Sequence, residues 1–169
     1  FLEAIRQMRK DVGRDNVMYI HVTLLPALAA TGELKTKPTQ HSVKELRAIG
    51  IQPDVIVLRS DHPVSQEIRD KISLFTDVAS EAVIPAETAS TIYEVPLLFE
   101  ESGLGALLVR ERGLENTAQL PDLESWRELG GRIKRPKPII EVALVGKDSE
   151  IPDACLSGVE SLKHAGRGH

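Results

Sequence analysis

Short apolar runs alternate with amphipathic stretches through the first half of this chain. The run from residue 17 to 25 is rich in β-branched residues and lacks strict alternation, which is typical of a central parallel strand buried on both faces. The amphipathic stretches repeat apolar residues at the spacing of a helix. This order predicts an α/β fold, with a parallel sheet flanked by helices. The predicted strands are residues 17–25, 55–58 and 82–84, the last ending at Pro85, and the predicted helices around them are residues 1–9, closed by Gly13, and 63–75.

A further helix is predicted between the first two strands, and it ends at Gly50. Ser42 and Glu45 form a capping-box pattern, and Thr39 is an alternative cap. Pro38 precedes both caps and favours an extended backbone at Lys37.

The second half of the chain predicts a change of domain. A stiff, basic linker at residues 134–138 separates two helical regions from a fresh strand. We therefore divide the chain into residues 1–113, a connecting segment at 114–138, and a new α/β unit at 139–169. The predicted elements are an apolar helix at 95–109 interrupted by Gly103 and Gly105, a loop at 114–121, a helix at 123–129 stopped by Gly130 and Gly131, a strand at 139–145, and a helix from about residue 152 to 164.

Three polar clusters each follow a predicted strand. They are residues 35–40, Arg59, and residues 87–89. The carboxyl ends of parallel strands meet at one edge of a sheet, where ligands bind in such folds. The sequence therefore predicts a binding site at that edge.

The first cluster carries two lysines that are two residues apart. On an extended backbone, Lys35 and Lys37 would project to the same side, which suits a triphosphate. The following helix start would add backbone N–H groups, and Gln40 would add a hydrogen bond. A solvated loop with incidental lysines explains the spacing equally well.

The other candidates also have two interpretations. Arg59 would lie on an adenine ring or hold a phosphate, whereas the alternative is a surface ion pair with Asp61. Lys71 lies on the polar side of a helix, where lysines are usually only solvated. The turn at Glu87 would offer backbone groups to a base, although most turns have no such role.

Composition excludes several classes of protein. The net charge is −4 and aromatic residues make up 4% of the 169 residues, which argues against nucleic-acid binding. A single cysteine, Cys155, excludes a disulfide framework, and the histidines show no metal-ligand spacing. Without an apolar run long enough to span a membrane, and without a signal peptide, we expect a cytoplasmic location.

Several segments together resemble one family. Residues 32–46 (GELKTKPTQHSVKEL) and 50–54 (GIQPD) resemble a signature of CTP synthase nearly letter for letter. Weaker similarity extends along the chain in the same order, and its segments are residues 1–7, 90–96, 145–147 and 152–166.

This resemblance implies a fold and an activity. The fold would be a P-loop NTPase-like amidoligase domain, incomplete here and ending near residue 113, followed by the start of a class I glutamine amidotransferase domain at residue 139. The family uses ATP and Mg²⁺ to aminate UTP to CTP with ammonia from glutamine, as the last step of de novo CTP synthesis. It assembles as a homotetramer.

The resemblance also implies roles for individual residues. UTP, or CTP as inhibitor, would contact Lys35, Thr36, Lys37, Pro38, Thr39, Gln40 and Lys71. The adenine of ATP would lie against Arg59, Glu87, Thr88 and Ala89.

Other parts of the family's machinery fall outside this chain. Its phosphate loop and metal-binding acids lie upstream of Phe1, and its glutaminase triad lies downstream of His169. We therefore expect no catalytic residue and no metal ligand here, and an internal fragment that is inactive alone. Asp148 and Cys155 stand where the family usually has tyrosine. The alternative function is a non-catalytic nucleotide-sensing or oligomerisation module.

Overall fold

The computed structural model describes residues 1–119, 121–147 and 152–168. The chain divides into two compact units, residues 1–120 and 121–169. The helices and strands of the first unit are α1 (Leu2–Val12), β1 (Ile20–Leu24), α2 (Lys37–Ala48), β2 (Val55–Ser60), α3 (Gln66–Thr76), β3 (Val83–Glu87), α4 (Val95–Glu101) and α5 (Leu104–Glu111), with short 3₁₀ turns at Arg14–Asn16, Ser80–Ala82 and Ile92–Glu94. The second unit contains α6 (Glu124–Lys134) and α7 (Pro152–Gly168).

The first unit is built on a parallel sheet, as predicted. Its strands lie in the order β1-β2-β3, and each strand pairs with the next one in parallel. The central strand β2 is apolar and almost wholly buried because it has a neighbour on each side. The register aligns Leu24 with Arg59, and Arg59 with Ala86, so the carboxyl ends of the strands meet at one edge.

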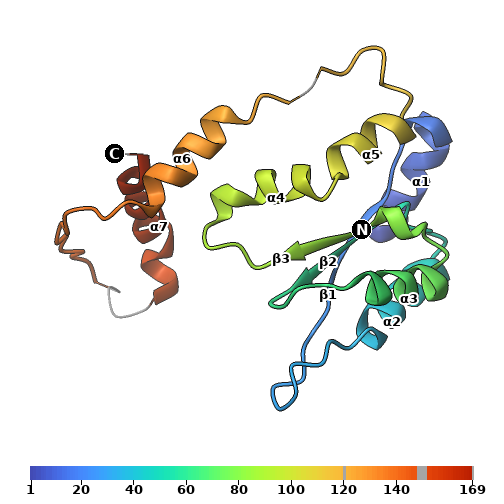
Figure 1. The fold of residues 1–169 in the computed structure, drawn as a ribbon, viewed down its shortest axis with the longest axis horizontal. Coiled ribbons are helices and arrows are strands. Elements are labelled where there is room, and N and C mark those ends of the chain that lie inside the picture. The colour runs from blue at the N-terminus through green and yellow to red at the C-terminus, as the bar shows by residue number, and fades with distance from the viewer. Residues whose placement is uncertain (120, 148–151, 169) are drawn as a thin grey trace. The chain divides into compact units, whose positions relative to one another are not determined.

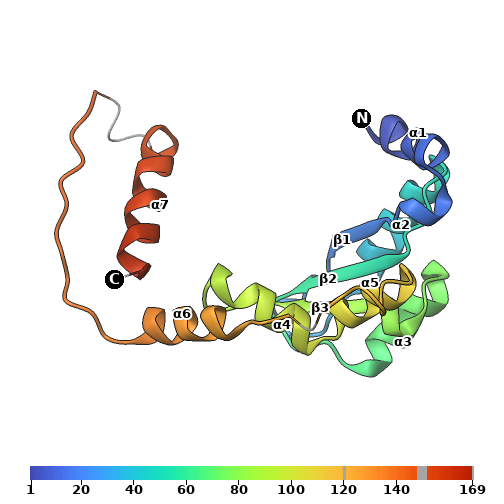
Figure 2. The ribbon, with the colours of Figure 1, turned by 90° about the horizontal axis from the view of Figure 1, so that it is seen from above.

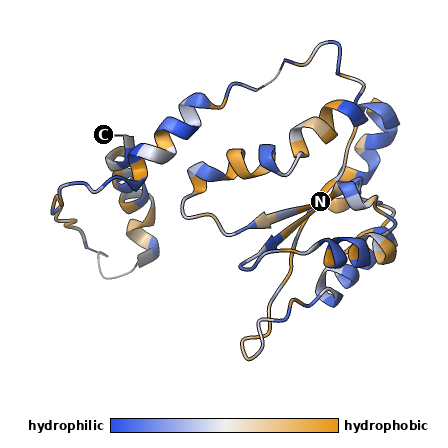
Figure 3. Ribbon diagram, viewed as in Figure 1, coloured by the Kyte–Doolittle hydropathy of each residue, from blue (hydrophilic) through white to orange (hydrophobic). Residues whose placement is uncertain are grey.

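Helices cover the sheet from two sides (Figures 1 and 2). α2 and α3 pack together on one face, against β1 and β3 respectively, whereas α4 lies against β3 on the other. Figure 3 shows hydrophobic stretches along α4 and α5. The core lies between these layers and includes Val43, Ile56, Leu58, Ile72 and Leu107.

The prediction that the first strand is buried on both faces is wrong. β1 is an edge strand, and Ile20, Val22 and Leu24 are 44%, 61% and 64% exposed. α4 packs against β3 at the far side of the sheet, so this face of β1 has no covering helix within the described residues. The apolar composition of residues 17–25 predicted a strand correctly, but it did not indicate which strands and helices lie beside that strand.

The start of α2 also differs from the prediction. The helix begins at Lys37, five residues before the expected cap at Ser42 and two before Thr39. Thr36 is its N-cap residue, and Pro38 lies in the first turn, where its missing N–H costs no helical hydrogen bond. Lys37 is therefore helical rather than extended.

Proline and glycine produced the other errors in the predicted boundaries. β3 continues through Pro85 to Glu87, which an edge strand tolerates because one side of its backbone has no partner strand. Gly103, at φ 79°, separates α4 from α5 as expected, but Gly105 lies inside α5. α6 continues through Gly130 and Gly131, which were expected to stop it.

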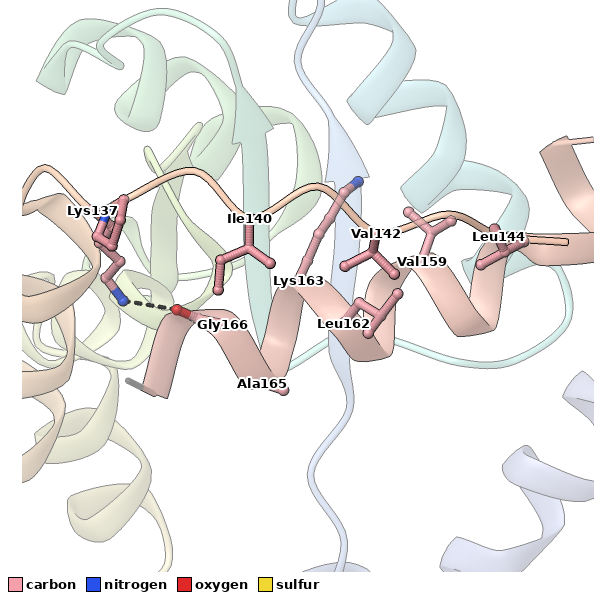
Figure 4. Close-up of a pocket in the computed structure, with 10 residues that line it drawn as sticks. Lys137, Ile140, Val142, Leu144, Val159, Leu162, Lys163, Ala165 and Gly166 are labelled. Atoms are coloured by element: carbon pink, nitrogen blue, oxygen red, sulfur yellow. Dashed lines mark hydrogen bonds between the residues drawn. The ribbon is translucent and has the colours of Figure 1, made fainter.

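The second unit departs most from the prediction. Residues 139–145 form no strand, because no neighbouring strand within the described residues is available for hydrogen bonding. The segment runs beside α7, toward which Ile140, Val142 and Leu144 alternate (Figure 4). Lys137 Nζ donates to the carbonyl oxygen of Gly166 at 2.9 Å and connects the two segments. α7 begins at Pro152, as predicted, and contains Cys155, whereas Asp148 lies outside the described residues.

Candidate functional site

A folded-back loop connects β1 to α2 and carries the first predicted cluster. Ala27 and Leu34 form an isolated antiparallel bridge, and the N–H of Lys35 donates to the carbonyl of Pro26 at 2.8 Å. Gly32, at φ 69°, occupies the left-handed region that the turn of this loop requires. The loop therefore returns the chain to the carboxyl end of β1, where Lys35 and α2 follow.

The two lysines have different surroundings. Lys35 Nζ forms an ion pair with Glu33 at 2.7 Å, and the two side chains are 40% and 61% exposed. Such a pair contributes only about 0–1 kcal/mol, so a phosphate would displace Glu33 at little cost. Lys37 is exposed at the first position of α2, whose first turn has no acidic residue and no side-chain cap. A cation at a helix N-terminus opposes the macrodipole, and a bound anion would relieve this repulsion.

The two threonines of the cluster are turned inward. The hydroxyl of Thr36, which is buried, accepts a hydrogen bond from Gln40 Nε2 at 3.1 Å. Thr39 is 0% exposed, and its hydroxyl lies 2.9 Å from that of Thr23 and donates to the carbonyl of Leu24 at 3.3 Å. Both hydroxyl groups therefore have protein partners, while Pro38 is exposed beside them.

The second predicted cluster is joined by hydrogen bonds. Arg59 donates from Nη1 to the carbonyl of Ala86 at 3.0 Å and from Nη2 to the hydroxyl of Thr88 at 3.3 Å. The same hydroxyl donates to the carboxylate of Asp61. The Thr88 hydroxyl thus links Arg59 to Asp61, the two residues for which a direct ion pair was the alternative interpretation. The backbone N–H of Thr88 donates to the carbonyl of Ser60 at 2.9 Å, which holds the bridge against β2.

Arg59, Ala86 and Thr88 border a cavity of about 550 Å³ on the α4 side of the sheet. Its lining is mostly apolar and includes all four residues that were predicted to contact adenine. The lining residues are Ile20, Val22, Val57, Arg59, Ala86, Glu87, Thr88, Ala89, Ile92, Val95, Leu98, Phe99 and Leu104.

The two clusters share an edge of the sheet but not a face. Arg59 lines the cavity on the α4 side, whereas Thr39 on α2 contacts the opposite face through Thr23. Lys71 is exposed on α3, and within the described residues no hydrogen bond or ion pair joins it to either cluster. The structure therefore contains two candidate subsites, and Lys71 belongs to neither by direct contact.

Sequence reasoning missed several residues behind these subsites. His21 Nε2 lies 2.9 Å from the hydroxyl of Ser42, and burial lowers the pKa of His21 below its usual value. His21 is therefore a partly buried side chain with a protein partner on α2. Thr23 and Asp61 were not proposed as site residues, and the only available signal was a polar side chain within or just after an apolar strand.

Metal binding and membrane insertion find no support in the described part of the chain. No three His, Cys, Asp or Glu side chains there gather closely enough to hold a metal ion. No helix among those residues is both long enough and apolar enough to cross a membrane.

A parallel sheet covered by helices, with polar side chains at the carboxyl ends of its strands, defines an α/β domain of the class that binds ligands at that edge. A family model provides a narrower assignment, because the model of the CTP synthase N-terminus matches residues 1–114. The chain belongs to the CTP synthase family. Its α/β architecture fits the P-loop-like amidoligase fold of that N-terminal domain.

Curated relatives extend the similarity to the whole chain. A CTP synthase of Roseiflexus sp. (strain RS-1) is 65% identical over 98% of this chain and 29% of its own length. CTP synthases of Thermomicrobium roseum and Carboxydothermus hydrogenoformans are 58% and 57% identical over 100% of this chain, which covers 30% and 31% of their lengths. The chain thus spans about 30% of the length of the relatives it matches.

Proposed function

We propose that this chain provides part of the nucleotide-binding surface of an enzyme that aminates UTP to CTP, using ATP and ammonia from glutamine. Membership of the CTP synthase family supports the reaction. The observation that carries the proposal is the first turn of α2, where Lys35 and Lys37 flank a helix N-terminus without an acidic residue. Two cations at such a position suit a triphosphate.

The first subsite would hold the triphosphate of UTP, or of CTP as inhibitor. Lys35 would exchange its exposed partner Glu33 for a phosphate oxygen, and Lys37 would bind beside the helix N-terminus. Gln40 Nε2 already donates to Thr36, and its two N–H groups allow a further bond. Lys71 would contribute only if the bound nucleotide extends to α3.

The second subsite would hold the adenine of ATP. Its apolar walls suit a planar base, and Arg59, with its guanidinium held by Ala86 and Thr88, would lie on the ring. Glu87 and Ala89 would approach the edge of the base. ATP in this family is used with Mg²⁺, but the described residues provide no metal site, and we assign no step through the metal to them.

Residues 139–169 would begin the glutamine-hydrolysing domain, after an amidoligase part ending at residue 113 and a connection at 114–138. The relatives are similar over this part as well. Ile140, Val142 and Leu144 alternate beside α7 (Figure 4). This is the side-chain pattern of a β-strand, whose partner strands would belong to the rest of that domain.

The test is the Lys35→Ala/Lys37→Ala variant of the full-length enzyme. Each lost charged contact to phosphate costs roughly 1.5–3 kcal/mol, so the UTP concentration for half-maximal rate should rise at least about tenfold. The ATP and glutamine requirements should change little. Lys44→Ala is a matched control because Lys44 is an exposed lysine further along α2. An unchanged UTP requirement in the double variant would refute the assignment.

Self-assembly is a second candidate role, as a homotetramer within the same enzyme. One observation favours it, because Leu74 and Phe75 are largely exposed at the end of α3. Sedimentation of the full-length protein and of its Leu74→Ser/Phe75→Ser variant would test it. We expect smaller species for the variant, whereas identical profiles would exclude α3 as an interface.

A further inference from the structure

A buried hydroxyl pair connects the first turn of α2 to the end of β1. Thr23 is 6% exposed and Thr39 is 0% exposed, and their hydroxyl oxygens lie 2.9 Å apart. Thr39 also donates to the carbonyl of Leu24 at 3.3 Å. Because the Thr39 side chain is not exposed and its hydroxyl already has protein partners, it is poorly placed to contact a nucleotide.

A second contact repeats this arrangement further along both elements. His21 lies two residues before Thr23 on β1, and Ser42 lies three residues after Thr39 on α2. Two residues along a strand and three along a helix both return to the same side, so the two pairs lie on one face of each element. One contact leaves a helix free to pivot, whereas two fix its rotation and its register along the strand.

We propose that Thr23 and Thr39 are positioning residues, which hold the first turn of α2 where Lys35 and Lys37 meet a bound triphosphate. This inference rests on the proposed function and changes the role predicted for Thr39 from contact to support. Lys37 is two residues from Thr39 within one helical turn, and the N–H of Lys35 donates to the carbonyl of Pro26, which follows the buried Leu25 just after β1. A shift of α2 along β1 therefore moves Lys37 directly and strains the connection to Lys35.

The energetics of buried hydroxyl groups determine which variants are useful. Thr39→Val leaves the Thr23 hydroxyl buried without its partner, which destabilises the fold for reasons unrelated to UTP. Thr23→Val/Thr39→Val removes both hydroxyl groups at almost constant volume, and such paired replacement is nearly neutral for stability. The double variant thus separates positioning from folding.

The experiment uses the full-length enzyme and compares Thr23→Val, Thr23→Val/Thr39→Val and Thr23→Ser. Steady-state kinetics are measured for UTP and ATP separately, below the unfolding temperature of every variant. We expect both valine variants to raise the KM for UTP about tenfold or more, because small displacements of binding groups have large effects. The KM for ATP should stay within about twofold, since the Arg59 cavity lies on the other face of the sheet. Thr23→Ser, which keeps the hydroxyl, should restore most of the UTP affinity.

A wild-type KM for UTP in the double valine variant would overturn the proposal, as would equal losses for UTP and ATP. Comparison with Lys35→Ala/Lys37→Ala separates this failure from that of the proposed function. If the lysine variant weakens UTP use and the valine variants do not, only the positioning role is wrong. If neither variant affects UTP use, the assignment of the lysine subsite is wrong as well.

Discussion

Arg59→Lys separates the two roles that the sequence left open for Arg59, because the variant keeps the charge and removes the planar fork. Arg59 binds the carbonyl of Ala86 at 3.0 Å and the hydroxyl of Thr88 at 3.3 Å with two different nitrogens. A lysine ammonium has no planar group to hold over a base and does not reproduce this geometry. A phosphate needs only the charge, whereas stacking on adenine needs the orientation of the guanidinium.

The magnitude follows from these contacts. Loss of one hydrogen bond that orients the guanidinium costs about 0.5–1.5 kcal/mol. Loss of cation–π stacking on a partly desolvated base costs about 0.5–2 kcal/mol. Together these losses amount to roughly 1–3.5 kcal/mol, which corresponds to a rise of about fivefold to several hundredfold in the ATP requirement.

The assay is the initial rate of the full-length enzyme against ATP concentration at saturating UTP, for wild type, Arg59→Lys and Arg59→Ala. If Arg59 lies on adenine, the lysine variant should lose nearly as much as the alanine variant. Arg69→Lys is a control on another arginine that donates to backbone carbonyls, those of Val83 and Ser80. An ATP requirement of Arg59→Lys equal to that of wild type would refute the adenine role and favour phosphate binding.

Three further predictions concern stability. Ile72→Ala, at a fully buried position in α3, should lower the free energy of unfolding by about 2–5 kcal/mol, and a loss below about 1 kcal/mol in urea titration would contradict the described core. Gly103→Ala should cost about 1 kcal/mol at φ 79° although no atom would clash, and an unchanged melting temperature would contradict the left-handed break between α4 and α5. Burial lowers the pKa of His21 in the folded state, so the unfolded chain binds this proton at a higher pH than the folded chain does. The contribution of neutral His21 to folding stability is therefore complete above about pH 6.5 and declines as pH falls below it. In thermal unfolding, the wild type should therefore lose more stability between pH 7 and 5 than the His21→Gln variant does. Equal losses of stability in the two proteins would contradict the lowered pKa of His21.

The apolar runs predicted the sheet because burying them requires strands with covering helices. Residues 55–58 lie wholly within β2, and the parallel order follows from helices placed between successive strands. The same reasoning failed at residues 139–145, where an apolar, β-branched run forms no strand because no partner strand lies within the described residues. The local hydrophobic pattern indicates that a segment is able to form a strand. Whether the strand forms depends on pairing with another strand from a distant part of the chain.

At the candidate site, too, the sequence predicted where residues lie in the sheet but not which side chains contact each other. Chain order alone was enough to expect Arg59 and Thr88 near one edge, because both follow from strand ends in a parallel sheet. The hydrogen bond between them and the second bond of Thr88 to Asp61 depend on side-chain geometry across the sheet. No spacing in the sequence indicates these contacts, since Asp61 and Thr88 are 27 residues apart.

By itself, the sequence determined the α/β class, the parallel sheet, and the edge at which polar residues gather, because these follow from hydrophobic pattern and chain direction. Tertiary structure decided that β1 is an edge strand, that α2 begins at Lys37, and that α2 and the Arg59 cavity lie on opposite faces of the sheet. It also turned Thr39 inward toward Thr23. Each of these features depends on which surfaces pack together, and packing is set by contacts between residues that are far apart in the chain.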